Sequence, residues 1–203
     1  MRVTRNPSAV RCHDGDMPAV HAIVLAGGRA RRLGGADKLL LRVDGRPLLA
    51  RVVAAVRDAD QVVVVGPRRE IPLPRDVTWV REDPPFGGPA DAVAAGFSAL
   101  QPGPGDEVLV LAGDLVRPDL VVDALRPGLG TRVGVDPAGR VQWACARVDA
   151  AELAASVTRG ETAGRSLRAL LGPLHPAEVA LTAEACADLD TPDDVKEYAD
   201  DER

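Results

Sequence analysis

The chain has 203 residues, a length sufficient for one α/β domain with a substantial core. Acidic residues outnumber basic ones, 30 to 25, and 2% of residues are aromatic, which argues against a general nucleic-acid binder. Three scattered cysteines, no apolar run of about 18 residues and no signal-peptide core predict a cytoplasmic protein outside the membrane.

Strand and helix patterns alternate along the chain. Apolar, β-branched runs predict parallel strands buried on both faces, and the amphipathic segments between them predict helices. We therefore expect an α/β fold with three layers, a Rossmann-like arrangement and a mostly parallel sheet. Residues 1–18 lack periodicity and predict a disordered tail, with Met17 a second candidate start, and we expect residues 19–203 to form one domain. The predicted strands are 22–26, 39–43, 61–65, 77–80, 108–111, 131–135, 141–146 and 178–181; the predicted helices are 47–57, an alanine-rich segment after the loop 84–89, 119–125, 150–157, 166–171 and a last one from 192.

The stretch 22–38, AIVLAGGRARRLGGADK, joins the first predicted strand to a glycine-rich, basic loop. Glycines without Cβ atoms let backbone amides face an anion, while arginine and lysine neutralise phosphate oxygens. The loop is neither a Walker A motif, because Lys38 precedes Leu39, nor a Rossmann fingerprint, because the glycine spacing differs. It predicts a nucleoside triphosphate site; the alternative is a solvated basic turn.

Four predicted strands end in a glycine or an acid, and parallel strands present their carboxyl ends at one edge of a sheet. We therefore expect these ends to converge on one crevice; they are 25–28, 65–66, 80–83 and 111–114. Asp114 is the most informative residue among them, because a carboxylate there can hold Mg²⁺ together with substrate phosphates. The residues alone leave a second interpretation equally open, in which Asp114 caps the helix that begins near Pro118.

The segment LAGGRARRLGGADKLLLRVDGRPLL resembles the N-terminal signature of the molybdenum cofactor guanylyltransferase family, within the wider nucleotidyltransferase-like group. The related cytidylyltransferases carry LAAG and Pro-Lys, so Gly27 and Asp37 favour guanine. The resemblance implies transfer of GMP from GTP to the phosphate of molybdopterin, with release of pyrophosphate. The matching residues are Leu25, Gly27, Gly28, Arg32, Leu33, Gly34, Asp37 and Lys38.

The resemblance also implies roles for single residues. The catalytic residues are Arg32 and Lys38, which would hold the triphosphate, and Asp114, which would bind the cofactor Mg²⁺; Asp190 is an additional candidate for the metal. Asp83 would help to hold the nucleoside, although Asp before Pro84 is also a common turn. The nucleotide-binding residues are Leu25, Ala26, Gly27, Gly28, Lys38, Asp83, Gly88 and Asp114.

Departures from the family pattern lie mainly in the half of the site expected to hold the acceptor. Gly66-Pro67-Arg68 replaces the usual Asn, Leu115-Val116-Arg117 intervenes before Pro118, and Gln142-Trp143-Ala144 lacks the family's proline. Two alternatives therefore stay open. One is a nucleotidyltransferase that uses CTP or another phosphorylated acceptor, and the other is a non-catalytic homologue that binds GTP or the cofactor. The implied partners are GTP, molybdopterin and a molybdoenzyme or cofactor-insertion protein, with no nucleic acid and no membrane.

Overall fold

A computed structural model describes residues 18–27, 37–85, 87–159, 162–187 and 189 of the chain. The strands in these ranges are β1 (Val20–Leu25), β2 (Arg42–Val43), β3 (Arg46–Pro47), β4 (Gln61–Val65), β5 (Thr78–Val80), β6 (Glu107–Ala112), β7 (Arg132–Val135), β8 (Val141–Asp149) and β9 (Ala177–Ala180). A seven-stranded sheet has the order β5-β4-β1-β6-β8-β7-β9, and β2 and β3 form a separate hairpin. The pairs β5–β4, β4–β1, β1–β6 and β7–β9 are parallel, whereas β8 is antiparallel to β6 and β7.

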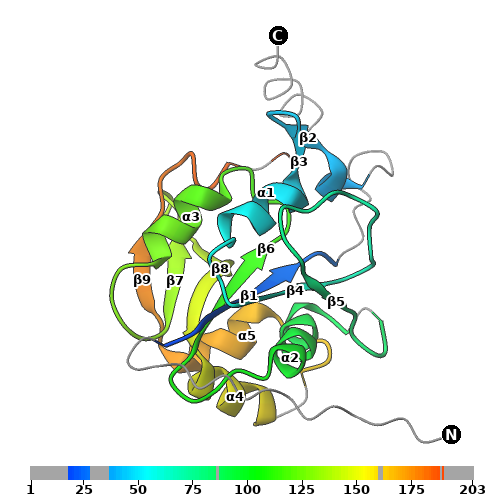
Figure 1. Cartoon of the computed structure of the whole chain (residues 1–203). Helices are drawn as coiled ribbons and strands as arrows, with labels where there is room; N and C mark the ends of the chain where they lie inside the picture. Colours follow the sequence, from blue (N-terminus) through cyan, green and yellow to red (C-terminus); the bar gives the residue numbers. More distant parts are fainter. Residues whose placement is uncertain (1–17, 28–36, 86, 160–161, 188, 190–203) are drawn as a thin grey trace, which may run out of the picture.

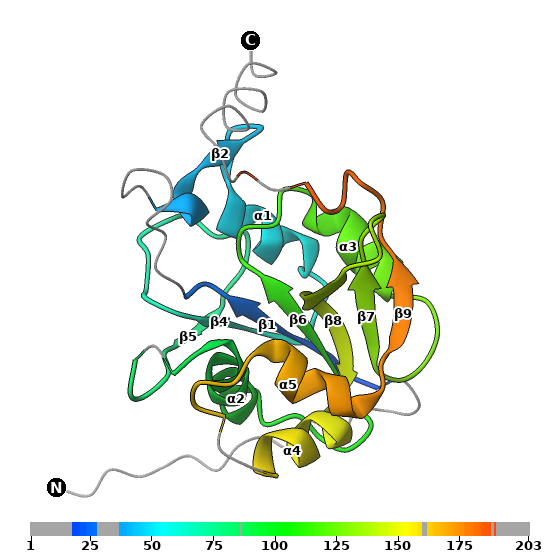
Figure 2. The same ribbon diagram turned by 180° about the vertical axis from the view of Figure 1, so that it is seen from behind.

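Helices cover both faces of this sheet (Figures 1 and 2). They are α1 (Leu48–Ala55), α2 (Pro89–Leu100), α3 (Pro118–Leu125), α4 (Ala150–Thr158) and α5 (Leu167–Leu171), with 3₁₀ turns η1 (Lys38–Leu40) and η2 (Gly172–Leu174). Alternate residues of β1 separate the two layers, because Val24 packs in the cluster that contains α1 and α3, and Ile23 packs in the cluster that contains α2, α4 and α5. The predicted three-layer α/β fold with a mostly parallel sheet is confirmed.

The strand predicted over residues 39–43 is wrong. The Asp37 carboxylate accepts the backbone N–H of Leu39 and starts the 3₁₀ turn η1, which buries the Leu39 side chain. Extended structure is restricted to Arg42–Val43, which pairs with Arg46–Pro47 across the turn Asp44-Gly45. The apolar run therefore serves a turn and a hairpin because a side-chain hydrogen bond outweighs its strand propensity.

The other predicted elements occur with small changes at their ends, the largest being β8, which continues beyond residue 146 to Asp149. The predicted helix from 192 and the tail over 1–17 lie outside the described residues. Among the described helices, none is long and apolar enough to cross a bilayer.

Candidate nucleotide-binding site

The first candidate for a ligand site is the sheet edge where the parallel strands end. From β1 the chain passes to β4 and β5 on one side, and then returns to place β6 on the other side. The order reverses between β1 and β6, and ligands of open α/β sheets bind at the carboxyl ends of strands that flank such a point. The predicted convergence of the strand ends of β1, β4, β5 and β6 is therefore confirmed by their adjacency.

Backbone hydrogen bonds lock the roots of these loops together just beyond the strands. Gly66 N–H donates to Val80 O at 2.8 Å, Ala26 N–H to Val65 O at 2.8 Å, and Gly113 N–H to Leu25 O at 2.9 Å. The row of bonds runs across all four strands, so the backbone that enters the glycine loop is held rigidly at Ala26.

Lys38 and Asp114 bring the first and last of these loops together. Lys38 follows the glycine loop, Asp114 follows β6, and their Nζ and Oδ2 atoms lie 3.3 Å apart. The side chains are 14% and 37% exposed, so the pair is partly accessible to solvent at the carboxyl edge of β1 and β6. A cation and a carboxylate, of the types that could serve a phosphate and a metal, thus lie at the topological switch point.

The capping interpretation of Asp114 is wrong. Helix α3 begins at Pro118, its N-cap residue is Arg117, and no side chain caps it. Since Pro118 fixes the start of the helix, Asp114 is too early in the chain to reach the free N–H groups of its first turn. The Asp114 carboxylate is therefore available to Lys38, with which it pairs, and could also hold a ligand.

The Asp114 carboxylate fits a magnesium ion better than a soft transition metal. Oxygen is the ligand type that Mg²⁺ prefers, and Mg²⁺ commonly takes one or two carboxylates and completes its shell with phosphate oxygens and water. In the described part of the chain, no three His, Cys, Asp or Glu side chains form a group that could hold a metal by themselves. The donor set thus suits a metal that arrives together with a nucleotide.

Arg69 holds the base of the glycine loop. Its Nε lies 2.6 Å from Asp37 Oδ2 and its Nη2 lies 3.3 Å from Asp37 Oδ1, while Nη1 donates to Ala26 O at 3.0 Å. Asp37 directly precedes Lys38. The guanidinium therefore connects the strand end of β1 to the residue next to Lys38.

The remaining predicted residues are distributed over the same edge. Leu25 ends β1 and Ala26 and Gly27 follow it directly; a Cβ on Gly27 would lie 3.8 Å from a carboxylate oxygen of Glu82. Asp83 is exposed in the loop after β5, and Gly88 is the N-cap residue of α2 with φ +98°. Gly28, Arg32 and Asp190 lie outside the described residues.

Strand β8 and the turn before it form the other half of this edge. Asp136 ends β7 with a side chain 3% exposed. It accepts backbone N–H groups of Ala138 and Arg140 at 2.9 Å and the Gln142 amide at 3.0 Å. These bonds, first that of the Arg140 N–H, hold the pKa of Asp136 below its usual value despite burial. The turn that presents Gln142 is therefore rigid.

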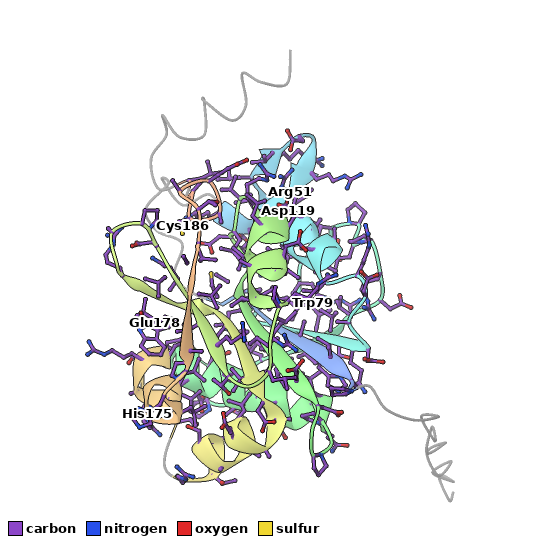
Figure 3. All side chains as sticks on the ribbon, turned by 90° about the vertical axis from the view of Figure 1, so that its left-hand side faces the viewer. Arg51, Trp79, Asp119, His175, Glu178 and Cys186 are labelled. Atoms are coloured by element: carbon purple, nitrogen blue, oxygen red, sulfur yellow. The ribbon has the colours of Figure 1, made fainter. Side chains whose placement is uncertain are left out.

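Two free cysteines lie near this turn, Cys145 buried and Cys186 partly buried. Burial, with smaller contributions from Cys186 and Asp114, raises the pKa of the Cys145 thiol to about 12. Cys186 is partly buried beyond β9, at the end opposite His175 (Figure 3). Burial, together with the nearby Asp136 charge, raises its pKa as well. Neither thiol is poised as a nucleophile.

Two side chains near the loop were not among the predicted site residues. Arg69 belongs to the sequence Gly66-Pro67-Arg68-Arg69, in which the paired arginines after a strand end were the available signal. Glu82 directly precedes Asp83, and no sequence feature distinguished which of the two acids faces the glycine loop.

Comparison with known proteins identifies relatives of this chain. Residues 22–178 match the family described as "MobA-like NTP transferase domain". A "probable molybdenum cofactor guanylyltransferase" of Synechococcus elongatus is 42% identical over 102 residues, 47% of this chain and only 50% of that relative. A "molybdenum cofactor guanylyltransferase" of Xanthomonas euvesicatoria pv. vesicatoria is 35% identical over 173 residues, 82% of this chain and 85% of that protein.

Solved structures share the fold at low sequence identity. The inositol-1-phosphate CTP transferase from T. maritima matches with a TM-score of 0.61 and 16% identity, covering 88% of this chain and 93% of that one. At this identity the likeness concerns the fold alone.

Proposed function

This chain belongs to the MobA-like NTP transferase family, and from that premise we propose that it transfers GMP from GTP to the terminal phosphate of molybdopterin. The observation that carries the proposal is the Lys38–Asp114 pair at the switch point between β1 and β6. Guanine and molybdopterin are the finer part of the proposal. They are supported by the sequence signature around Gly27 and Asp37 and by the names of the relatives.

The reaction needs positioning and charge neutralisation rather than a covalent nucleophile on the protein. An oxygen of the acceptor phosphate attacks the α-phosphorus of GTP, a new P–O–P bond forms, and the bond to the β-phosphate oxygen breaks with departure of pyrophosphate. Lys38 exchanges its ion pair with Asp114 for phosphate oxygens, and Arg32 assists it. Asp114 would hold Mg²⁺, and the metal would supply neutralisation of the phosphate charge.

Pyrophosphate release with GTP, CTP or ATP, Mg²⁺ and molybdopterin tests this proposal. Asp114→Asn should lower the release at least about 100-fold, because it removes the charge that holds the metal but keeps the side-chain shape. Asp119→Asn is the matched control. Asp119 lies in the first turn of α3, pairs with Arg117, and lines a groove between α1 and α3 with Arg51 (Figure 3).

The outcomes separate the alternatives. Release that requires GTP, molybdopterin and Asp114, and survives Asp119→Asn, supports the guanylyltransferase. Release with CTP or another phosphorylated acceptor keeps the reaction class and overturns the substrate. GTP binding without release under any of these conditions leaves a binding protein.

A further inference from the structure

The Arg69 side chain donates hydrogen bonds to two segments of the chain, one directly before and one directly after the glycine loop in the sequence. One acceptor is the backbone carbonyl of Ala26, directly after β1, and the other is the carboxylate of Asp37, directly before η1. A second bond from Nη1 reaches Pro67 O at 3.0 Å, and the Arg69 side chain is 13% exposed. The four bonds thus engage all three nitrogens of the guanidinium and hold its plane in one orientation.

The bonds from Arg69 to Asp37 matter because Asp37 sets the position of Lys38. The Oδ1 atom of Asp37 accepts Leu39 N–H at 3.1 Å, and its backbone carbonyl accepts Leu40 N–H at 3.0 Å. These bonds form the 3₁₀ turn η1, which begins at Lys38. Arg69 therefore ties the turn that carries the phosphate-binding lysine to the strand end that carries the loop amides.

The ion pair between Arg69 and Asp37 also changes the electrostatic potential near Lys38. The Asp37 carboxylate precedes the lysine that faces the triphosphate, and an uncompensated negative charge there would repel the nucleotide. The guanidinium of Arg69, with its Nε 2.6 Å from Asp37 Oδ2, compensates this charge.

We propose that Arg69 is a positioning residue for the nucleotide, which acts through Asp37 and Ala26 without touching the substrate. The inference rests on the proposed function, since it concerns how the same site is held ready for a triphosphate. It extends the site to the β4–β5 connection, which the sequence signature does not include.

The same connection offers a matched control arginine. Arg75 also binds backbone carbonyls, those of Arg57 and Ala59 at 2.9 and 2.5 Å, but these lie beyond the end of α1. Both Arg57 and Ala59 precede β4, and the amino end of that strand lies at the sheet edge opposite the candidate nucleotide site. Arg69→Ala and Arg75→Ala therefore remove comparable networks at opposite edges.

The test is GTP affinity by calorimetry without acceptor, combined with amide hydrogen exchange of the nucleotide-free proteins. Arg69→Ala should weaken GTP binding about tenfold, the size of one charge-assisted hydrogen bond, and accelerate exchange at Leu39 and Leu40. Arg69→Lys should recover part of the affinity, because lysine restores the charge but not the fork. Arg75→Ala should leave GTP affinity and exchange at both amides within about twofold of the parent, whatever it does to the melting temperature.

A double variant measures the charge effect. If the uncompensated carboxylate repels the nucleotide, Arg69→Ala combined with Asp37→Asn should bind GTP more tightly than Arg69→Ala alone. Parent-like GTP affinity of Arg69→Ala, or an equal loss in Arg75→Ala, overturns this inference and leaves the proposed function standing. A parent protein that binds none of GTP, CTP and ATP overturns both.

Discussion

Replacing Gly66 by alanine tests how rigidly the loop roots are built. Gly66 has φ +149°, and a Cβ there would lie 2.5 Å from Ala26 O, 2.6 Å from Ala26 C and 2.8 Å from Gly27 N. All three are backbone atoms, and ordinary contacts of a carbon are about 3.5–4 Å, so the overlap is about 1 Å. Adding overpacking to backbone strain, we expect Gly66→Ala to lower the free energy of unfolding by about 2–4 kcal/mol.

The added Cβ would displace one particular part of the backbone, the Ala26–Gly27 peptide. The carbonyl of this peptide accepts a hydrogen bond from Arg69, and its N–H is that of Gly27, where the glycine loop begins. We therefore expect Gly66→Ala to weaken GTP binding about tenfold or more in addition to its cost in stability. Urea unfolding and calorimetric titration with GTP measure the two effects separately.

Gly105→Ala is the control for the backbone conformation itself. Gly105 has φ +88° with nothing within 4 Å of a built Cβ, and it precedes β6 at the opposite sheet edge. This variant should lose only about 1 kcal/mol and keep full GTP affinity. If Gly66→Ala bound GTP as tightly as Gly105→Ala does, the argument that the Ala26–Gly27 backbone is fixed for nucleotide binding would be refuted.

Two further predictions concern titratable groups beside β8. Hydrogen bonds from the Arg140 backbone and side chain hold the pKa of Asp136 below its usual 3.8, so the stabilisation is present above about pH 3.8 and disappears as the pH falls through the lower folded value. Asp136→Asn should thus lower the urea midpoint at pH 7, and its difference from the parent should shrink below about pH 4; a constant difference down to pH 2 contradicts the assignment. Because burial raises the pKa of Cys145 to about 12, its thiol should resist a thiol-alkylating reagent in the folded protein at pH 8 and react in urea, as peptide mapping would show; rapid native labelling at Cys145 is the opposite result.

The parallel half of the fold was predictable because its sequence pattern and its topology support each other. A run such as QVVVV in β4 is apolar without alternation, as a strand covered by helices on both faces must be. Once such strands are parallel, their carboxyl ends share an edge, and glycines and acids at those ends meet. The adjacency of Ala26, Gly66 and Asp114 loops follows from that rule alone.

Side-chain contacts over long sequence separations were not predictable in the same way. Asp37 and Arg69 are 32 residues apart, and either could have been a solvated charge. Whether Asp114 caps α3 likewise depended on where that helix begins. Pro118 decides that question only when the helix is seen to start there, with Arg117 as its N-cap residue.

In the half of the site expected to hold the acceptor, the directions of the side chains could not be predicted for a different reason. The regular alternation of side chains along β8 is interrupted there. The pairing of β7 with β8 shifts from Val133–Ala146 to Gly134–Gln142, so the residues between are displaced from regular register. Alternation would place Trp143 and Cys145 on one face, yet Trp143 packs in the α2, α4 and α5 cluster and Cys145 in the α1 and α3 cluster. The direction of each side chain from 142 to 145 is thus set by the bulge and not by the pattern. Since these are also positions where the chain departs from the family signature, acceptor choice has to be measured, and the pyrophosphate assay with alternative acceptors addresses it directly.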